Sequence, residues 1–321
     1  MIYKFNPILK QTIWGGEKIL RFKSIDSTLN SVGESWELSA VKDNESVITF
    51  GQHIGKNITQ LLSEQREQLV GKTNYERFGN TFPLLIKFID ANQDLSIQVH
   101  PNDQQAERLH GTRGKTEMWY VVDTEQGAHL RSGLNQKVTP DEYEAKVNDG
   151  TITDILCDYE ISPGDVFFLP AGRIHSIGKG SFIAEIQETS DITYRIFDFN
   201  RVDKNGKPRE LHTALARQVI DFNVESDYRT HYQPSLNKRV ELVSCPLFTT
   251  NLFELTSSKS LSYADLDSFV IWMALDGKSD CECDGIATTL NAGETILLPA
   301  TSNGFKVTPH TTAKLLEIYI S

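Results

Sequence analysis

The chain has 321 residues, of which 39% are hydrophobic and 23% charged, and its formal net charge is −11. This composition is typical of a globular protein, and no apolar run approaches the roughly 18 residues of a membrane-spanning helix. A strongly acidic chain repels nucleic acid and anionic lipid, so we expect neither partner. Residues 1–7 lack the apolar core and basic flank of a secretory signal, which predicts a cytoplasmic protein.

The four cysteines indicate neither a disulfide framework nor a closed zinc site. Cys157, Cys245, Cys281 and Cys283 lack the paired CxxC spacing of a zinc ribbon and the density of a disulfide scaffold. The Cys-Glu-Cys triplet at 281–283 is a weak metal motif. We therefore expect reduced thiols.

The first eighty residues read as scaffold. Residues 1–50 predict short strands joined by turns, in which Trp14 and Trp36 are core or pocket-wall aromatics. Residues 58–69 place Ile and Leu at helical spacing among Gln, Glu and Arg, which predicts a surface helix with one buried stripe.

The next strand carries a lysine inside an apolar run. Residues 82–89 are interrupted only by Pro83 and Lys87. A lysine there is costly unless its amine reaches a partner or a wet cavity, so Lys87 is a site candidate. The alternative is a lysine whose amine reaches solvent at the strand's edge.

Polar residues alternate with apolar ones along residues 95–101, which predicts a strand with one wet face. Ser96, Gln98 and His100 share that face, because side chains two apart on a strand point the same way. Gln98 and His100 could therefore bind one ion. The alternative for His100 is a bond to a backbone carbonyl.

A polar stretch over residues 102–114 precedes another strand, predicted from Lys115 to Val122, in which Lys115 and Glu117 share a face. Residues 139–156 then begin with Thr-Pro-Asp-Glu, a helix start with Pro at the first helical position. This segment reads as a helical insertion between strands.

Residues 161–177 predict a turn, a buried strand, a Pro-x-Gly turn and His175 at the start of the following strand. Residues 181–199 continue as one strand in this interpretation. If no bulge intervenes, Glu185, Gln187, Asp191 and Arg195 lie on one face of it.

The last part of the chain repeats the first. Residues 213–219 predict a short helix and 222–239 a polar linker, after which residues 290–301 repeat the pattern of 161–172, and 271–276 that of 118–123. We therefore expect a mainly β protein with two similar barrels and a few inserted surface helices, divided into a catalytic domain at 1–235 and a degenerate one at 236–321. Val270 and Gly304 fall where Glu117 and His175 stand, so the chemistry is expected in the first domain.

In such a barrel the wet faces converge near one end and bring together two imidazoles, a carboxylate and an amide, supplied by Gln98, His100, Glu117 and His175. This set suits catalytic zinc, with a position left for water or substrate. Manganese, iron, cobalt and nickel also bind mixed N/O sites, and the sequence leaves them open.

The stretch Gly164-x5-Pro170-x-Gly172-x2-His175 matches the second cupin motif. Together with Gln98-Val-His-Pro-Asn-Asp103, Gly114-Lys-Thr-Glu117 and Ser190-Asp-Ile-Thr-Tyr-Arg195, it resembles type I mannose-6-phosphate isomerase in a short bacterial form, from Asn6-Pro7 to the end of the chain. The resemblance implies two jelly-roll cupin barrels and an enzyme that interconverts mannose 6-phosphate and fructose 6-phosphate.

The resemblance also implies residue roles. It makes Gln98, His100, Glu117 and His175 the ligands of one Zn²⁺ per chain. Its implied catalytic residues are Lys115, Arg195 and Asp191, the last standing where the family has an acid implicated in ring opening. Lys87, Ser96 and Glu185 are expected to bind the substrate, a small sugar phosphate. A monomer and a weak homodimer both remain open.

The sequence departs from the family pattern in two places. Gly114 stands where longer members often have His before the Lys, so a proton-transfer role for that His does not carry over. The inserted helical domain of the longer forms is missing, so the pocket should be more open on one side. Neither change removes an expected ligand.

The isomerisation moves a proton from C2 to C1 through an enediol, so the site must stabilise oxygen charge and hold a base. Lys115, a zinc-bound hydroxide and an acid such as Glu185 all remain candidates for that base. Two other functions compete, a metal-dependent cupin dioxygenase and a non-catalytic sugar-binding cupin. The inward cations argue against the first, and the complete ligand set argues against the second.

Overall fold

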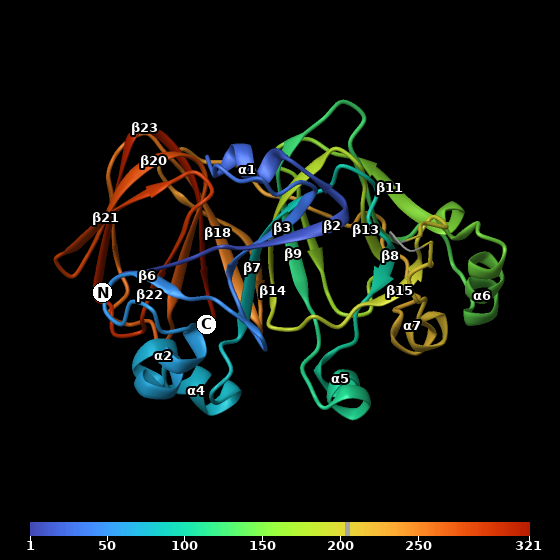
Figure 1. Cartoon of the computed structure of the whole chain (residues 1–321), viewed down its shortest axis with the longest axis horizontal. Helices are drawn as coiled ribbons and strands as arrows, with labels where there is room; N and C mark the ends of the chain where they lie inside the picture. Colours follow the sequence, from blue (N-terminus) through green and yellow to red (C-terminus); the bar gives the residue numbers. More distant parts are fainter. Residues whose placement is uncertain (203–205) are drawn as a thin grey trace.

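The computed structural model describes residues 1–202 and 206–321, and its elements are mainly antiparallel β-strands with a few short helices (Figure 1). Three sheets carry the fold. Among the described helices, none is long and apolar enough to cross a membrane.

The first two sheets face each other and enclose one core. Ile89, Trp119 and Ile183 of one sheet pack against Leu130 and Ile177 of the other. The seven-stranded sheet has the order β16 (Arg229–Thr230), β12 (Val166–Leu169), β9 (Glu117–Thr124), β14 (Ser181–Glu188), β7 (Leu84–Asp90), β3 (Val32–Leu38) and β2 (Ile8–Gly16). The five-stranded sheet has the order β11 (Leu156–Glu160), β10 (His129–Leu134), β13 (His175–Ile177), β8 (Ile97–Val99) and β15 (Tyr194–Phe197).

The third sheet, called here the C-terminal sheet, has nine strands, two of which come from the start of the chain. Its main path is β17 (Arg239–Cys245), β18 (Phe248–Leu255), β23 (Gly304–Tyr319), β20 (Val270–Cys283), β22 (Thr295–Leu298), β1 (Tyr3–Phe5) and β6 (Ile48–Phe50), with β19 (Lys259–Ser262) beside β23 and β21 (Ile286–Asn291) beside β20. β4 (Ala40–Val41) and β5 (Asn44–Glu45) form a separate pair.

Side chains alternate between the two faces of the seven-stranded sheet, and each face packs against a different hydrophobic core. On β9, Trp119 and Val121 face the core shared with the five-stranded sheet, whereas Met118 and Tyr120 face a larger cluster shared with the C-terminal sheet. The period-two pattern of a strand thus supplies both faces with apolar side chains. Polar residues on the inner face, among them Lys87 and Glu185, must therefore find partners inside the fold.

Helices cover the outside of these sheets. Tyr143 of α6 and Val219 of α7 pack on the outer face of the five-stranded sheet, and α2 to α4 lie below the C-terminal sheet in Figure 1. The helices are α1 (Lys18–Phe22), α2 (Ile58–Gln65), α3 (Glu67–Val70), α4 (Lys72–Phe78), α5 (Asp103–His110), α6 (Pro140–Asn148), α7 (Thr213–Val219) and the 3-10 turn η1 (Ile152–Ile155).

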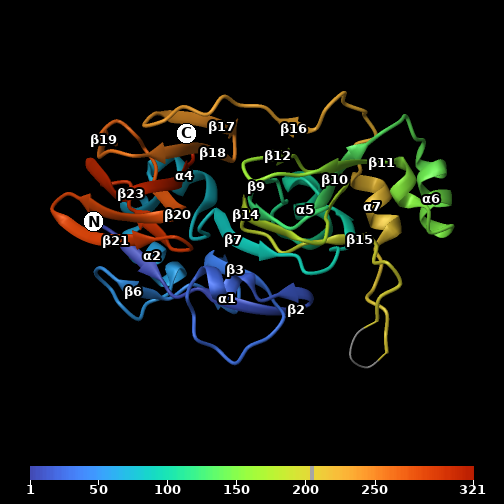
Figure 2. The same ribbon diagram turned by 90° about the horizontal axis from the view of Figure 1, so that it is seen from above.

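Several predicted elements are confirmed in place. α7 spans the predicted residues, and α6 begins at the predicted cap, with Thr139 and Glu142 bonded reciprocally as a capping box. The linker at 222–239 crosses the surface and contributes only β16, as Figure 2 shows along the upper edge of the molecule. Its two-residue pairing with β12 ties it to the seven-stranded sheet.

Other predicted boundaries are wrong, each for a local reason. The inserted helix ends at Asn148 because Gly150 takes a positive φ of 70° and starts a new turn. The helix predicted over 58–69 is broken into α2 and α3 at Arg66, whose φ is 50°. The strand predicted from Lys115 begins at Glu117.

The polar stretch 102–114 and the segment 181–199 also differ from expectation. The first contains α5, which begins at the Asn102 and Gln105 capping box and buries only Ala106, so its apolar stripe is too thin to read. The second is two strands, β14 and β15, because the chain leaves the sheet after Glu188. The alternation predicted through Asp191 therefore does not continue.

Candidate active site

Three candidate metal ligands meet at the inner edge of the two facing sheets. His100 follows β8, Glu117 begins β9 and His175 begins β13, and one ligand atom from each lies within 4.8 Å of the other two. His175 Nε2 is 3.2 Å from Glu117 Oε1, and His100 Nε2 is 3.7 Å from Glu117 Oε2. Within residues 1–202 and 206–321 this is the only His, Cys, Asp and Glu group of that kind.

Backbone carbonyls orient both imidazoles toward Glu117. His100 Nδ1 donates to the carbonyl of Ile192 (2.8 Å), and His175 Nδ1 donates to that of Arg173 (2.9 Å). The protonated nitrogen is thus Nδ1 in each ring, and Nε2 is unprotonated in both. Burial, reinforced by the charge of Lys115, lowers the pKa of His175 to about 4 and that of His100 well below its usual range. Both rings are neutral at neutral pH, as metal binding requires.

Glu117 is a buried carboxylate whose oxygens lack hydrogen-bond partners in the part of the chain that the structure describes. Its side chain is fully buried, and among the described residues neither carboxylate oxygen has a hydrogen-bond partner, nor does Nε2 of His100. Burial, with the charge of Glu185, raises the pKa of Glu117 to about 7, although Lys115 Nζ lies 3.4 Å from Oε2. Buried polar atoms without partners are rare in folded proteins, and a divalent cation would satisfy all three at once.

Gln98 joins this group from β8. Its amide Nε2 donates to His175 Nε2 at 3.2 Å, and a half-turn of the amide presents the oxygen on the same side. The structure therefore brings all four predicted ligands together. The two imidazole nitrogens, the carboxylate and the amide form a mixed N/O donor set that fits a divalent metal.

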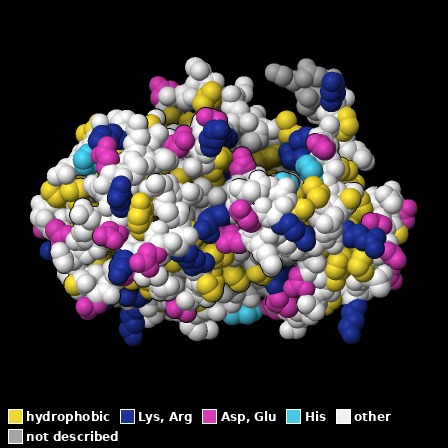
Figure 3. Space-filling model, turned by 90° about the horizontal axis from the view of Figure 1, so that it is seen from below, with side chains coloured by type: hydrophobic (Ala, Val, Ile, Leu, Met, Phe, Trp, Pro, Cys, Tyr) yellow, Lys and Arg dark blue, Asp and Glu magenta, His cyan; other side chains and the backbone are white. Residues whose placement is uncertain are grey.

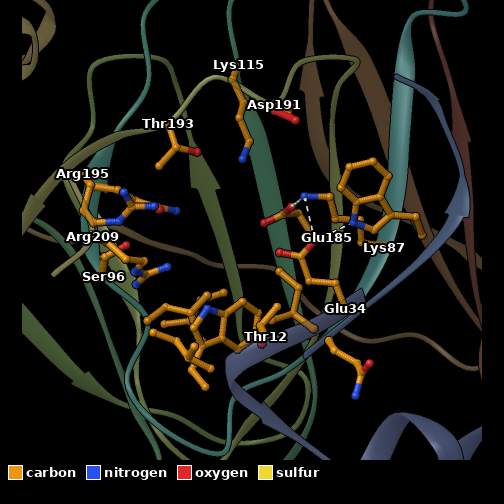
Figure 4. A pocket seen from close by; sticks show the side chains of 18 residues that line it. Thr12, Glu34, Lys87, Ser96, Lys115, Glu185, Asp191, Thr193, Arg195 and Arg209 are labelled. Atoms are coloured by element: carbon orange, nitrogen blue, oxygen red, sulfur yellow. Dashed lines mark hydrogen bonds and ion pairs between the residues drawn. The ribbon is translucent and has the colours of Figure 1, made fainter. Parts of the chain in front are cut away.

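A cavity of about 440 Å³ adjoins the group, since it is lined by Gln98 and by Lys115, whose amine lies 3.4 Å from Glu117. Figure 4 shows its polar side chains in two clusters on opposite sides. Every residue predicted to be catalytic or substrate-binding lines this cavity, namely Lys87, Ser96, Lys115, Glu185, Asp191 and Arg195.

One side of the cavity is a chain of alternating charges. Lys87 Nζ lies 3.1 Å from Glu185 Oε1 and 3.9 Å from Glu34 Oε2. Burial lowers the pKa of Lys87, but Glu185 and Glu34 outweigh it and leave that pKa raised. Burial likewise raises the pKa of Glu185, and the nearby Lys87 and Lys115 reverse the shift and lower it. Lys87 is thus a charged amine facing the cavity.

The other side holds two arginines. Arg195 and Arg209 both line the cavity, and Asp198, which is 4% exposed, accepts from Arg209 Nε at 2.7 Å and from Arg201 at 2.5 Å. Arg195 donates through Nη1 to the carbonyl of Glu210 at 2.9 Å. Asp198 therefore fixes the direction of Arg209, and the guanidinium groups concentrate positive charge in an acidic chain. On the face drawn in Figure 3, by contrast, acidic and basic side chains are mixed.

Sequence reasoning missed Arg209 and Glu34. Arg209 lies in an irregular segment with no periodic pattern, and Glu34 looked like an ordinary polar residue of an alternating strand. The predicted common face of Glu185, Gln187, Asp191 and Arg195 holds only for Glu185 and Gln187, which are two apart on β14; Asp191 and Arg195 lie beyond the end of that strand. Gln187 is buried and donates to the carbonyls of Glu188 and Ser190, because the chain turns there.

Gly114, the departure noted in the sequence, lies against the backbone of residues 101–103. A Cβ built on Gly114 would approach the carbonyl carbon of Asn102 to 2.4 Å and the nitrogen of Asp103 to 2.5 Å. A larger residue would force this backbone apart. Lys115 thus follows a close contact between two chain segments.

The C-terminal sheet repeats the strand pairing around the site without its ligands. Glu117 of β9 stands opposite Leu169 of β12, and Val270 of β20 stands opposite Leu298 of β22 in the matching antiparallel pair. Gly304 begins β23. The structure therefore supports the internal repeat that the sequence indicated and the loss of ligands from its second copy.

Comparison with known proteins identifies the family of this chain. The family model for the catalytic domain of type I phosphomannose isomerase matches residues 2–128. The mannose-6-phosphate isomerase ManA of Bacillus subtilis is 33% identical over 308 residues, covering 94% of each chain. The chain belongs to the type I phosphomannose isomerase family.

Two further relatives place the chain within this phosphomannose isomerase family. The mannose-6-phosphate isomerase of Streptococcus mutans is 32% identical over 295 residues, covering 91% of this chain and 90% of that one. The crystal structure of the Bacillus subtilis mannose 6-phosphate isomerase superposes with a TM-score of 0.89 at 29% identity, over 99% of both chains. The Salmonella typhimurium enzyme, at 16% identity and a TM-score of 0.79, shares the fold.

Proposed function

We propose that this protein interconverts mannose 6-phosphate and fructose 6-phosphate. The observation that carries the proposal is the buried His100, Glu117 and His175 group, with three unpartnered ligand atoms, beside a cavity lined by cations. A metal site alone suits many cupin reactions, but the cavity also holds two lysines and two arginines against Glu34, Glu185 and Asp191, and the arginine side favours a bound anion. Membership of the family supplies the sugar phosphate as that anion.

The proposed cofactor is one Zn²⁺ per chain, held by Gln98, His100, Glu117 and His175. When bound, it would act as a Lewis acid toward the oxygens at C1 and C2 of the open-chain sugar, which is worth several kcal/mol of charge stabilisation. The neutral imidazoles, each with an unprotonated Nε2, support this assignment.

The phosphate is proposed to bind on the side of Arg195 and Arg209, with Ser96 beside them. Guanidinium groups bind phosphate bidentately. Arg209 donates to Asp198 and Arg195 to the carbonyl of Glu210, and each guanidinium has further N–H groups with which it could bind the phosphate. The opposite side, with Lys115 and Glu185, then faces C1 and C2. Figure 4 shows the separation of the two sides that such an orientation needs.

Proton transfer is proposed to use Lys115 and Glu185, the two titratable groups nearest the ligand set within the cavity. The lowered pKa of Glu185 keeps it ionised, so it can accept the C2 proton, while Lys115 stabilises charge developing on the adjacent oxygen. Asp191, exposed at the cavity's rim, is proposed to act in ring opening, as the family resemblance implies.

We further infer that each group of strands is a cupin-type jelly-roll barrel, with a catalytic domain at 1–235 and a degenerate one at 236–321. The pairing of β1 with β22 and β6 adds two amino-terminal strands to the second domain. The repeated strand register supports the barrel assignment. A cytoplasmic location, as a monomer or weak homodimer, is part of the same proposal.

A direct assay tests the function. Zinc-loaded protein is incubated separately with mannose 6-phosphate and with fructose 6-phosphate, and each product is measured by NMR or a coupled assay. Conversion in both directions to one common ratio is expected. Binding of the sugar phosphate without conversion would indicate the non-catalytic alternative, and oxygen consumption would indicate the dioxygenase.

A further inference from the structure

Trp119 connects the cavity wall to the ligand set. Its indole Nε1 donates to Glu185 Oε2 at 2.8 Å, and its ring meets that of His175 edge-on, with centroids 5.2 Å apart at 84°. Trp119 is fully buried and Glu185 is 3% exposed. Because Oε2 is taken by the indole, Oε1 is the oxygen that faces Lys87 and the cavity.

The C-terminal sheet contains the same cross-strand pair. Trp119 stands opposite Glu185 between β9 and β14, and Trp272 stands opposite Glu317 between β20 and β23. Trp272 Nε1 donates to the hydroxyl of Tyr263 at 3.2 Å, and that hydroxyl donates to Glu317 Oε1 at 2.5 Å. The tryptophan and the glutamate are therefore coupled in both copies, directly in one and through a tyrosine in the other.

The surroundings of the pair differ between the copies. Register places Asn251, opposite Glu317, where Lys87 stands opposite Glu185, and Asn251 donates to Glu317 Oε2 at 3.0 Å. Arg239 supplies the cation at 2.7 Å from Glu317 Oε1.

In the second copy an aromatic ring stacks on the tryptophan of the pair. Phe305, next to the glycine that replaces a histidine ligand, stacks on Trp272 with centroids 4.9 Å apart. The pair thus persists in a copy that has Val270 and Gly304 in place of two of the metal ligands. Its formation does not require those ligands.

We infer that Trp119 is a positioning residue, which holds the Glu185 carboxylate and the His175 ring in place before metal and substrate bind. A hydrogen bond on one edge and a ring contact on the other restrict both partners through one rigid side chain. Groups outside the ligand set that orient it commonly change metal affinity or activity by about 10–100-fold. The kinetic part of this inference rests on the proposed function, whereas the metal-binding part does not.

Trp119→Phe tests the inference, with Trp272→Phe as its matched control. Each variant replaces a fully buried indole by a smaller ring, so the loss of packing is similar. Zinc affinity is measured by competition with a chelating dye on metal-free protein, beside thermal unfolding. Trp119→Phe is expected to weaken zinc binding about tenfold, and Trp272→Phe to lower only the unfolding temperature. Equal zinc affinities in the two variants would overturn the inference.

Two substitutions of Glu185 test the hydrogen bond from its other end. Glu185→Gln keeps an oxygen that can accept from Trp119, whereas Glu185→Ala does not, and both lose the same charge. Zinc affinity should be at least threefold lower in Glu185→Ala than in Glu185→Gln, even if Trp119→Phe fails to fold. Equal affinities would show that the bond does not position the site.

A double variant tests the kinetic part. If Trp119 acts through Glu185, Trp119→Phe should lower kcat about tenfold in the wild-type background and change KM little. In the Glu185→Ala background the same substitution should lower kcat less than twofold. Equal effects in both backgrounds would contradict the inference. Failure of every form to isomerise sugar phosphates would refute the proposed function and leave the zinc measurements to decide the positioning role.

Discussion

Lys115 lies two residues before Glu117, the first residue of β9, and its Nζ is 3.4 Å from Glu117 Oε2, with both side chains buried. The amine therefore adjoins a candidate metal ligand and also lines the cavity. A cation held beside a metal site is electrostatically unfavourable in the absence of an anion. The Lys115 amine thus lies between the candidate ligand set and the cavity, which is the position that its proposed role in stabilising oxygen charge requires.

Replacing Lys115 by Met is expected to lower kcat/KM for mannose 6-phosphate at least about a hundredfold while zinc content stays at one per chain. Met has a similar reach without a charge, so packing is preserved. Steady-state kinetics and elemental analysis of the same sample make the measurement. Loss of zinc together with activity would instead show that Lys115 maintains the ligand set.

Removal of the imidazoles should abolish metal binding. His100→Ala and His175→Ala are each expected to contain less than a tenth of the wild-type zinc and to be inactive, since each removes a ligand whose Nε2 is unprotonated. His231→Ala, at an exposed histidine outside the site, is the control and should retain both zinc and activity. A full complement of zinc in either ligand variant would refute the assignment.

The arginine side of the cavity predicts that the substrate must carry a phosphate group. Unphosphorylated mannose should react with a kcat/KM at least about a hundredfold lower than mannose 6-phosphate, which corresponds to roughly 2.7 kcal/mol, and inorganic phosphate should compete with the substrate. Arg195→Ala should keep its zinc and lose most of this preference, because a guanidinium binds the anion and not the metal. Equal turnover of the two sugars by the wild type would mean that the arginines have another role.

Glu188 predicts a pH-dependent stability outside the cavity. Burial, with Asp103 as a second cause, raises the pKa of Glu188 from 4.5 to about 7. The folded state therefore binds the proton more tightly than the unfolded chain, and stability is lost as the pH rises from 4.5 through 7. Glu188→Gln should be more stable than the wild type at pH 8 by about 2 kcal/mol, with a difference that shrinks toward pH 4.

Urea unfolding at several pH values measures this effect. Glu76→Gln, at an exposed glutamate of α4, is the control and should give a profile parallel to that of the wild type. A Glu188→Gln curve that also stays parallel to the wild type across this range would contradict the prediction.

Much of the site was predictable because strand periodicity is a local property. The spacing of Gln98 from His100, and of Lys115 from Glu117, fixes their common faces without knowledge of the fold. The buried Lys87 was conspicuous for the same reason, since a charge in an apolar run demands a partner. Its partners, Glu185 and Glu34, come from neighbouring strands, and only one of them stood out in the sequence.

The remainder depended on contacts that leave no local pattern. Arg209 reaches the cavity from an irregular segment because Asp198 holds it there, and neither residue repeats at a helix or strand period. The end of β14 at Glu188 was missed because the following residues keep a strand-like alternation while their backbone turns away. α5 was missed because it buries a single alanine.

The pairing of β1 with β22, at Tyr3 and Leu297, also has a consequence for how the protein is made. On the ribosome β1 emerges first, and one of its two neighbours is translated almost last. The edge of β1 must wait for β22 and is open to wrong partners in the interval. A nascent chain that stops before β22 therefore carries an unfinished C-terminal sheet with an unpaired edge at β1, and slow translation of the last segment should favour aggregation.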